Sequence, residues 1–331
     1  MDNRKRNIAV VYGGYSSEWE ISVQSGKSVA GWLRGAGMNV YETVISKDRW
    51  EVLCPNGKEE ARRYPVNKDD FSFTMEDGRH VRPDKAYIVI HGDPGENGRL
   101  QAYFELIGMP YVGCTSLCTA IAFDKYACKT YLRDSGISMA PDLMLRKGDR
   151  YDPKETVSAL GLPVFVKPTG GGSSFGVTKV KREEDLNAAL DAAFAESDTV
   201  IIETAITGRE IDCGVYDDKT GVHALPLIQI VPRNEFFDYE AKYLGASKEI
   251  CPAPVTESER ELIQTEAVKI FRRLGCNGLV RMDFILGDDG KAYFLELNPN
   301  PGMTAASLVP QMVRQAGMTM EDFLKELIDR D

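Results

Sequence analysis

Residues 279–298 read LVRMDFILGDDGKAYFLELN, two extended runs that flank the turn signal Gly287-Asp-Asp-Gly290. This pattern predicts a β-hairpin, with either Asp288-Asp289 or Asp289-Gly290 at the turn. Side chains of a strand alternate between its two faces, so both registers give the same division of residues. One face carries the polar residues Arg281, Asp283, Glu296 and Asn298. The other carries the apolar residues Met282, Phe284, Leu295 and Leu297.

The polar face of this hairpin suits a hard metal ion. Two carboxylates and an amide oxygen are ligands that Mg²⁺ prefers, together with the phosphates of a substrate. The same residues are also compatible with a solvated outer face. On such a face an Arg281–Glu296 pair would contribute little to stability. The hairpin taken alone leaves both interpretations open.

The N-terminal third alternates strand and helix signals. Strands are expected at 8–12, 39–45, 86–90 and 110–112, and helices at 17–33 and 99–107. Ser17 and Glu20 have capping-box spacing at the start of the first helix. The alternation predicts an open, largely parallel sheet whose ligands gather at the loops after its strands, near Gly13-Gly14 and His91-Gly92. Residues 46–84 are polar and fit this pattern poorly, so we interpret them as an insertion.

A glycine-rich loop marks the middle of the chain. One long helix is expected over 116–134, and a strand at 163–168 then leads into Thr169-Gly-Gly-Gly-Ser-Ser-Phe-Gly176. Free backbone N–H groups in such a loop approach an anion closely, and Lys167 adds a positive charge. A β-turn without a ligand remains the alternative. Further along, the loop 234–245 mixes aromatic and charged residues, which favours a lid over a rigid loop.

Composition excludes several classes of protein. The 331 residues are 43% hydrophobic and 27% charged, with 40 Lys and Arg against 50 Asp and Glu, a formal charge of −10. An acidic chain argues against sequence-independent binding to nucleic acid or to an anionic membrane. No apolar run approaches the ~20 residues of a membrane span, and the first apolar stretch is too short for a signal peptide, so a cytoplasmic location is expected.

The cysteines indicate a reduced protein. There are seven, scattered along the chain and mostly in apolar context, which is typical of small core residues. Cys114 and Cys118 are four residues apart, but none of the three histidines is near them in sequence. The sequence therefore does not favour a zinc site there.

Taken together, these segments resemble the D-alanine–D-alanine ligases of the ATP-grasp superfamily. The matching segments occur in the same order along nearly the whole chain: GGYSSEWEISVQSG, IHGDPGENGRLQ, FDKYACK, VFVKPTGGGSSFGVTKV, FFDYEAKY, VRMDF and FLELNPNPGMTAASLVPQ. The resemblance implies an α/β fold with α+β character in its C-terminal part. It also implies three domains: an N-terminal open α/β domain (1–114), a central small domain (115–204) and a C-terminal domain (205–331), with ATP clamped between two antiparallel sheets.

The resemblance also implies the chemistry. One D-alanine is phosphorylated by ATP, and the amine of a second attacks the acylphosphate to give the peptidoglycan precursor D-alanyl-D-alanine. The residues implied to bind ATP are Lys125, Lys167, Gly172, Ser173, Ser174, Glu203, Thr204, Ala205, Ile206, Glu210 and Lys242. Two Mg²⁺ or Mn²⁺ would be held by Asp283, Glu296 and Asn298. A requirement for a monovalent cation is left open.

The implied substrate contacts come from four regions. Glu18 would bind the ammonium of the first D-alanine, with His91 nearby, and Ser173 would link Glu18 to Tyr243. Arg281 and the Gly302 N–H would bind the oxyanion, while Ser307 and the Leu308 N–H would hold the second carboxylate. The family usually has Thr-Ser or Thr-Thr where this chain has Pro299-Asn300.

Three functions remain open at this point. The first is D-alanine–D-alanine ligase, expected to act as a homodimer on small molecules without nucleic acid or membrane. The second is a ligase with another acceptor, such as D-serine. The third is a regulatory ATP-binding protein without turnover, which the full set of lysines, carboxylates and Arg281 disfavours.

Overall fold

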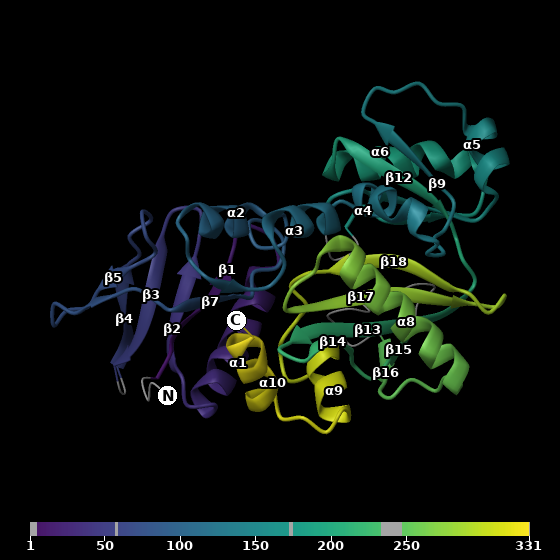
Figure 1. The fold of residues 1–331 in the computed structure, drawn as a ribbon. Coiled ribbons are helices and arrows are strands. Elements are labelled where there is room, and N and C mark those ends of the chain that lie inside the picture. The colour runs from purple at the N-terminus through teal and green to yellow at the C-terminus, as the bar shows by residue number, and fades with distance from the viewer. Residues whose placement is uncertain (1–4, 57–58, 172–174, 233–246, 331) are drawn as a thin grey trace.

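The computed structural model describes residues 5–56, 59–171, 175–232 and 247–330. Within these residues, three large β-sheets organise the chain, one in each third, and a two-stranded sheet is added to the first (Figure 1). Helices join them and cover their faces, so the predicted α/β class is confirmed. No helix among the described residues is long and apolar enough to cross a membrane.

The N-terminal sheet has the order β4-β3-β2-β1-β7-β8. Its strands β2, β1, β7 and β8 are parallel, as predicted, because β1 is an apolar run buried on both faces. The segment 46–84 adds β3 and β4 as antiparallel edge strands and a small β5–β6 hairpin, so it widens the sheet. The elements are β1 (Asn7–Gly13), α1 (Trp19–Gly35), β2 (Asn39–Ile45), β3 (Trp50–Asn56), β4 (Glu59–Pro65), β5 (Phe73–Thr74), β6 (His80–Val81), β7 (Lys85–Ile88), α2 (Arg99–Leu106) and β8 (Tyr111–Val112).

The turn from β1 into α1 depends on two glycines. Gly13 and Gly14 both have φ of +101°, a conformation that only glycine adopts readily. A Cβ on Gly14 would lie 2.5 Å from the side chain of Ile90, so this turn packs directly against the loop after β7. The predicted Ser17 cap is wrong, because Glu18 is the N-cap and no side chain caps the helix.

The helix expected over 116–134 is broken. It forms α3 (Ser116–Phe123), α4 (Lys125–Leu132) and the short η1 (Arg133–Ser135), with Asp124 in extended backbone between the two α-helices. The Asp124 carboxylate accepts hydrogen bonds from the Ala127 N–H at 2.8 Å and from the Thr169 hydroxyl at 2.8 Å. A new helix therefore begins at Lys125, beside the glycine-rich loop.

The central sheet is small and wholly antiparallel, in the order β11-β10-β12-β9. Helices α5 and α6 lie with it, away from the N-terminal sheet (Figure 1). Its apolar core combines strand residues with one face of α6. The elements are β9 (Asp142–Arg146), α5 (Pro153–Leu160), β10 (Val164–Pro168), β11 (Thr178–Val180), η2 (Glu183–Asp185), α6 (Leu186–Glu196) and β12 (Thr199–Thr204).

The third sheet is also antiparallel, in the order β16-β15-β13-β17-β18, with β14 paired to β13. Helix α8 packs on it and begins with a capping box formed by Thr256 and Glu259. The elements are β13 (Gly208–Asp218), β14 (Gly221–Ala224), β15 (Ile228–Pro232), β16 (Ser247–Ile250), α8 (Glu257–Leu274), β17 (Leu279–Gly287), β18 (Ala292–Asn298), α9 (Leu308–Gln315) and α10 (Met320–Asp329).

The predicted hairpin forms β17 and β18, with one irregularity. Arg281 pairs with Asn298 and Asp283 with Glu296, and the pairing then shifts so that Phe284 opposes Phe294. Leu295 is the extra residue of this β-bulge. It leaves the apolar face where alternation placed it, and Phe294, 1% exposed, takes that position in the core.

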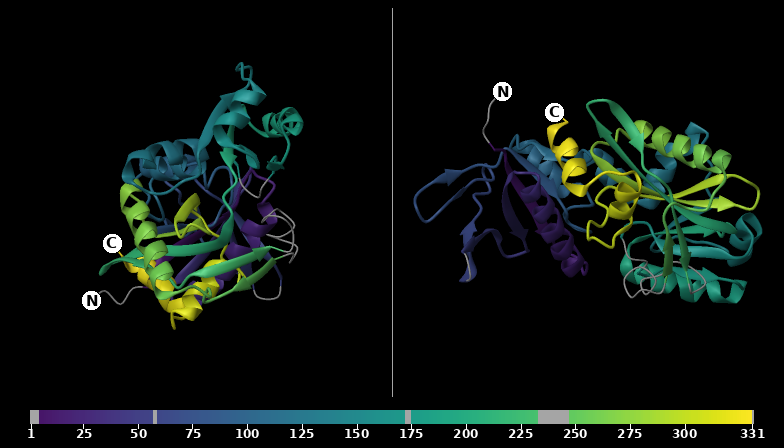
Figure 2. Two further views of the ribbon diagram at one scale, coloured as in Figure 1. Left: turned by 90° about the vertical axis from the view of Figure 1, so that its right-hand side faces the viewer. Right: turned by 90° about the horizontal axis from the view of Figure 1, so that it is seen from below.

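The C-terminal helices join the first and third sheets. The right-hand view of Figure 2 shows them between the N-terminal sheet and the C-terminal sheet. One apolar cluster includes residues of β1 and α1 together with residues of β13, β15, α9 and α10. This shared core fixes the N-terminal loops relative to the polar face of the hairpin.

Candidate active site

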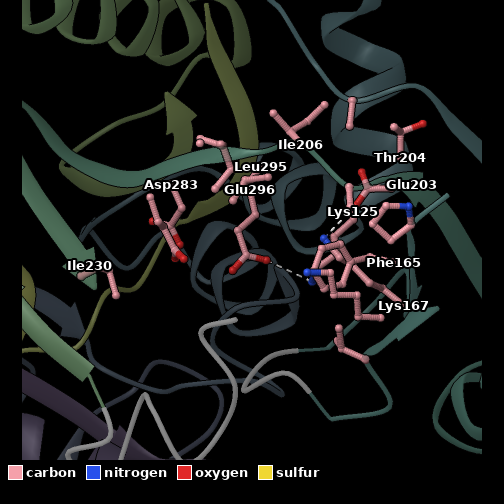
Figure 3. A pocket seen from close by; sticks show the side chains of 18 of the residues that line it. Lys125, Phe165, Lys167, Glu203, Thr204, Ile206, Ile230, Asp283, Leu295 and Glu296 are labelled. Carbon is pink, nitrogen blue, oxygen red and sulfur yellow. Dashed lines mark ion pairs between the residues drawn. The ribbon is translucent and has the colours of Figure 1, made fainter. Parts of the chain in front are cut away.

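A cavity of about 490 Å³ lies between the central and the C-terminal sheets. Strands β10 and β12 line one side, and strands β13, β15, β17 and β18 line the other. Its lining combines apolar with charged residues, and Figure 3 shows Lys125 and Lys167 on one side of Glu296 and Asp283 on the other. This size and lining are typical of a site for a small molecule.

Two lysines, one from α4 and one from β10, reach this cavity. Lys125, the first residue of α4, contacts Glu296 at 3.3 Å and donates to the Gly171 carbonyl at 3.0 Å. Lys167 lies near the end of β10 and contacts Glu203 at 2.8 Å. Burial lowers the pKa of Lys167, but the charge and hydrogen bond of Glu203, together with the charges of Glu296 and Glu210, give a net increase. Both lysines therefore present positive charge to an anionic ligand.

Glu203 connects Lys167 to a third lysine that sequence reasoning missed. Lys129 is 1% exposed, and its Nζ lies 2.5 Å from Glu203 and 3.0 Å from Asp142. Burial raises the pKa of Glu203, but the charges of Lys167 and Lys129 lower it to about 2. A lone lysine on a helix is usually exposed, so the only sequence signal for Lys129 was its position one turn after Lys125.

The hairpin supplies a second charged group. Both oxygens of Asp283 accept hydrogen bonds from Arg281, at 2.7 and 2.8 Å, and Asn298 donates to Asp283 at 3.1 Å. Asp283 and Glu296 line the cavity, and Figure 3 shows Glu296 between Asp283 and the lysines. These carboxylates and the Asn298 amide oxygen are hard donors, so the residues present fit a divalent cation such as Mg²⁺.

Asp212 on β13 is a further acid at this position that the sequence did not single out. It is fully buried opposite Asp283 in the sheet, and its oxygen lies 3.3 Å from Arg281 Nε. Neither of its carboxylate oxygens accepts a hydrogen bond within the described part of the chain. Burial raises the pKa of Asp212, and the charge of Asp283 raises it further. Arg281 thus holds two carboxylates together.

The cavity also has an apolar part, formed from both of its sides, that suits a flat aromatic ring. Phe165, Ile206, Ile230 and Leu295 line it, and Figure 3 shows them distributed around the charged residues. The segment Glu203–Ile206 runs along the wall where β12 ends. Glu210 of β13 lies on the same lining. The bulge thus gives Leu295 an apolar place in the cavity wall.

Glu18 and His91 form a second group outside the lining of this cavity. Ser16 donates to the His91 carbonyl at 2.7 Å, which ties the loop before α1 to the loop after β7. The His91 ring is buried, and its Nδ1 lies 3.8 Å from Glu96. Burial lowers the pKa of His91, but Glu96 and then Glu18 raise it, with a net increase.

Asn300, one of the two residues at which this chain differs from the usual family pattern, has a structural role. Its side chain is buried and donates to the Gly95 carbonyl at 2.7 Å, in the loop that begins at His91. The residue that replaces the usual serine or threonine therefore fixes this loop against the end of β18.

The residues after Asn300 form a third group. A Cβ on Gly302 would lie 3.1 Å from the Ser307 hydroxyl, so these two predicted residues are adjacent. The Ser307 Oγ also accepts from the Thr304 N–H at 3.0 Å. Ser307 is the N-cap of α9 and Leu308 its first residue, so free N–H groups begin here.

Five predicted site residues lie outside the described residues: Gly172, Ser173, Ser174, Lys242 and Tyr243. The predicted lid at 234–245 lies outside them as well. The structure brings together ten others. Nine line the cavity, and the tenth, Asn298, donates to one of them, Asp283; the nine are Lys125, Lys167, Glu203, Thr204, Ala205, Ile206, Glu210, Asp283 and Glu296.

Comparisons with known proteins agree across the chain. A family model described as D-ala D-ala ligase N-terminus matches residues 7–114, and one described as D-ala D-ala ligase C-terminus matches residues 131–329. A D-alanine–D-alanine ligase of Phocaeicola vulgatus is 45% identical over 98% of this chain and 99% of its own. One of Parabacteroides distasonis is 45% identical, over 98% and 97%.

Two solved structures have the same fold. The VanG D-Ala:D-Ser ligase of Enterococcus faecalis superimposes with a TM-score of 0.86 at 31% identity, covering 98% of this chain and 99% of that one. The D-alanyl-alanine synthetase A of Vibrio cholerae has a TM-score of 0.86 at 29% identity, covering 98% and 97%. The similarity spans all three sheets.

Proposed function

The chain belongs to the D-alanine–D-alanine ligase family, and we propose that it joins two D-alanines with the conversion of one ATP to ADP and phosphate. The product, D-alanyl-D-alanine, would enter peptidoglycan synthesis. The observation that carries this proposal is one cavity in which Lys125 and Lys167 face the carboxylates of the hairpin. The relatives at 45% identity support the same reaction.

ATP would occupy the cavity between the two antiparallel sheets. Its phosphates would lie at Lys125 and Lys167, whose positive charges reach the same end. Adenine would pack between the apolar residues of the two sheets and bond to the backbone at Glu203–Ile206, and Glu210 would hold the ribose. Phosphoryl transfer needs mainly positioning and charge neutralisation, which this arrangement provides.

Asp283, Glu296 and Asn298 would hold Mg²⁺ or Mn²⁺, and we propose two ions on the basis of the family. Bound divalent ions neutralise charge on the β- and γ-phosphates. Asp283 now accepts two bonds from Arg281, and Glu296 contacts Lys125. Arg281 and Lys125 thus neutralise these two carboxylates, and divalent ions would take the place of these cations when a nucleotide enters.

The substrates would lie between the cavity and the loops of the N-terminal sheet. A carboxylate oxygen of the first D-alanine attacks the γ-phosphorus and ADP leaves, which gives an acylphosphate. The amine of the second then attacks the carbonyl carbon, loses a proton, and expels phosphate. Glu18 would bind the first ammonium, with His91 beside it. Ser307 and the Leu308 N–H would orient the second carboxylate.

Arg281 would act when the carbonyl oxygen becomes negatively charged. Its guanidinium is fixed by Asp283 at 2.7 Å and by Asp212 at 3.3 Å, so it is oriented before reaction. The Gly302 N–H would be the second donor. Preorganised donors of this kind stabilise the tetrahedral intermediate more than the ground state.

Glu296→Gln tests the assignment at the hairpin. We expect loss of turnover with little change in melting temperature, because an amide lacks the second charged oxygen that a bridging ligand needs. Asp289→Asn is the matched control, since Asp289 is on the same hairpin but exposed at its turn. Near-normal turnover in Glu296→Gln would refute the metal assignment.

An acceptor panel tests the substrate. The solved D-Ala:D-Ser ligase makes D-serine the specific alternative to D-alanine as the second substrate. With ATP, Mg²⁺ and D-alanine, we expect D-alanyl-D-alanine to exceed the mixed dipeptide when D-serine is present at equal concentration. Dominant formation of the mixed product would favour the alternative acceptor.

The family also motivates a proposal about the oligomeric state and the location of the protein. We propose a homodimer that acts in the cytoplasm, where ATP and D-alanine are available. Light scattering during size-exclusion chromatography would check this, with a mass of twice the 36.8 kDa chain as the expected result.

A further inference from the structure

Three cysteine thiols from separate segments meet away from the candidate active site. Cys114 follows β8, Cys118 is in the first turn of α3, and Cys276 follows the glycine that ends α8. Their Sγ atoms all lie within 4.8 Å of one another, and those of Cys118 and Cys276 are 3.6 Å apart. The three residues are 1%, 2% and 5% exposed.

This spacing is close to that of a metal–thiolate site. Three sulfurs at about 2.3 Å from one ion are about 3.8–4.0 Å apart in a tetrahedral or trigonal arrangement. The thiols therefore need to move by only a fraction of an ångström to share an ion. Cys114 and Cys118 have C-x₃-C spacing, within the range of metal sites, and folding adds Cys276 as the third ligand.

Sequence alone could not show this group, because Cys276 is 158 residues from Cys118. The sequence did not favour a metal site at Cys114 and Cys118, because no histidine is near them and the third cysteine is distant in the sequence. Across the described residues, no other three His, Cys, Asp or Glu ligand atoms converge so closely. Three sulfur ligands select soft, thiophilic ions and disfavour Mg²⁺ or Ca²⁺.

The alternative is that these are ordinary reduced core residues. Cys128 and Cys213 are examples, since both are buried in the same apolar cluster but belong to no such group. The trio differs because its thiols hydrogen-bond one another. The Cys118 thiol donates to the Cys276 sulfur at 3.6 Å, whereas the Cys213 thiol donates to a backbone carbonyl, that of Gly214.

We propose that Cys114, Cys118 and Cys276 together bind one soft thiophilic ion of the Cu(I) or Zn(II) class. Each coordinated thiol releases its proton to solvent, so binding releases up to three protons per ion. Such an ion would join the end of the N-terminal sheet, α3 and the turn into β17. Because β17 carries Arg281 and Asp283, the ion would stabilise a strand of the candidate active site.

Cd(II) is the probe, because its thiolate bonds give a charge-transfer absorption in the ultraviolet. Reduced, chelator-treated protein is titrated with Cd(II), and absorption, proton release and melting temperature are followed. We expect one ion per chain and a rise in melting temperature. Cys276→Ser and Cys118→Ser should each lower the affinity more than about 10-fold. Cys128→Ser is the matched buried control and should bind as the parent does.

Circular dichroism and melting without metal show whether each variant is folded, and Cys276→Ala is the substitute if the serine is not tolerated. Competition with Zn(II) and with Cu(I) under reductant then distinguishes the two ions. Equal Cd(II) affinity in folded Cys276→Ser, or no thiolate band in the parent, would overturn the proposal. A Cys118–Cys276 disulfide in place of metal binding would overturn it too. These measurements do not depend on ligase activity, so the proposed metal site can fail while the proposed function holds, and the reverse.

Discussion

Glu203 shows how single residues set the charge of this site. It is 6% exposed, and it is stable as an anion only because Lys129 and Lys167 lie on its two oxygens. Lys167 is also placed to meet a ligand, whereas Lys129 is enclosed by Glu203, Asp142 and the Ala140 carbonyl. Lys129 therefore neutralises the site from behind, and Lys167 is left to act toward the cavity.

Lys129→Met should be strongly destabilising. It removes one cation and leaves the buried carboxylates of Glu203 and Asp142 undercompensated, a change that typically lowers the free energy of unfolding by about 3–5 kcal/mol. Urea unfolding measures this. Lys154→Met on the surface of α5 is the control and should change stability by less than about 0.5 kcal/mol. Equal stability of the two variants would contradict the buried network.

Acid should weaken the same network. The pKa of Glu203 is lowered in the folded state to about 2 from 4.5, so its contribution is complete above pH 4.5 and is lost as the pH falls toward 2. The stability advantage of the parent over Glu203→Gln should therefore shrink by about 2 kcal/mol between pH 6 and pH 3. Urea unfolding of both proteins at each pH checks this. A difference that stays constant with pH would show that Glu203 is not held as a low-pKa anion.

Arg281 should affect chemistry more than nucleotide binding. Arg281→Ala is expected to lower kcat by about 10²–10³ with a smaller change in KM for ATP, because one oxyanion donor is lost. Arg281→Lys keeps a charge beside Asp212 and Asp283, so it separates rate loss from instability. Steady-state kinetics and melting curves provide the comparison. A variant impaired only in KM for ATP would make Arg281 a phosphate ligand.

At the scale of elements, the hairpin shows what periodicity predicts and where it fails. Alternation placed Arg281, Asp283, Glu296 and Asn298 on one face, and the structure has them there. It also placed Leu295 in the core, which is wrong, because the bulge inserts Leu295 as an extra residue. A bulge depends on packing between strands, here Phe294 against Phe284, and the strand's own pattern does not show it.

The break at Asp124 has a function that helical periodicity could not reveal. The sequence predicts one helix over 116–134, but the Asp124 carboxylate is bonded to Thr169, 45 residues away in the sequence, which favours two helices. The Lys125 N–H also donates to the Thr169 carbonyl at 2.8 Å. The break therefore aligns Lys125 with the glycine-rich loop.

Asp124→Ala should impair both stability and ATP binding. Loss of the cap lowers the free energy of unfolding by about 1 kcal/mol, and misplacement of Lys125 should raise KM for ATP about 10-fold. Asp152→Ala is the matched control. It removes the equivalent cap of α5, where Asp152 accepts from the Lys154 N–H at 2.8 Å, and Asp152 does not line the cavity. If the two variants had the same KM, the proposed alignment would be wrong.

At the scale of the molecule, sequence predicted the fold class and the family, and both are confirmed. Local patterns sufficed for the parallel strands β1, β2 and β7 and for α2. They were insufficient for 46–84, where polar edge strands resemble loops until they pair with β2. They also missed Lys129, Asp212 and Cys276, whose roles arise only from contacts between distant segments.

The central claim is that one active site phosphorylates a D-alanine carboxylate and then forms the peptide bond. D-alanine labelled with ¹⁸O in its carboxylate, incubated with the protein, ATP and Mg²⁺, tests it most directly. Because the bridging oxygen of the acylphosphate leaves with phosphate, mass spectrometry should find one ¹⁸O in each phosphate released and one D-alanyl-D-alanine per phosphate. Unlabelled phosphate, or phosphate release without dipeptide, would contradict the account.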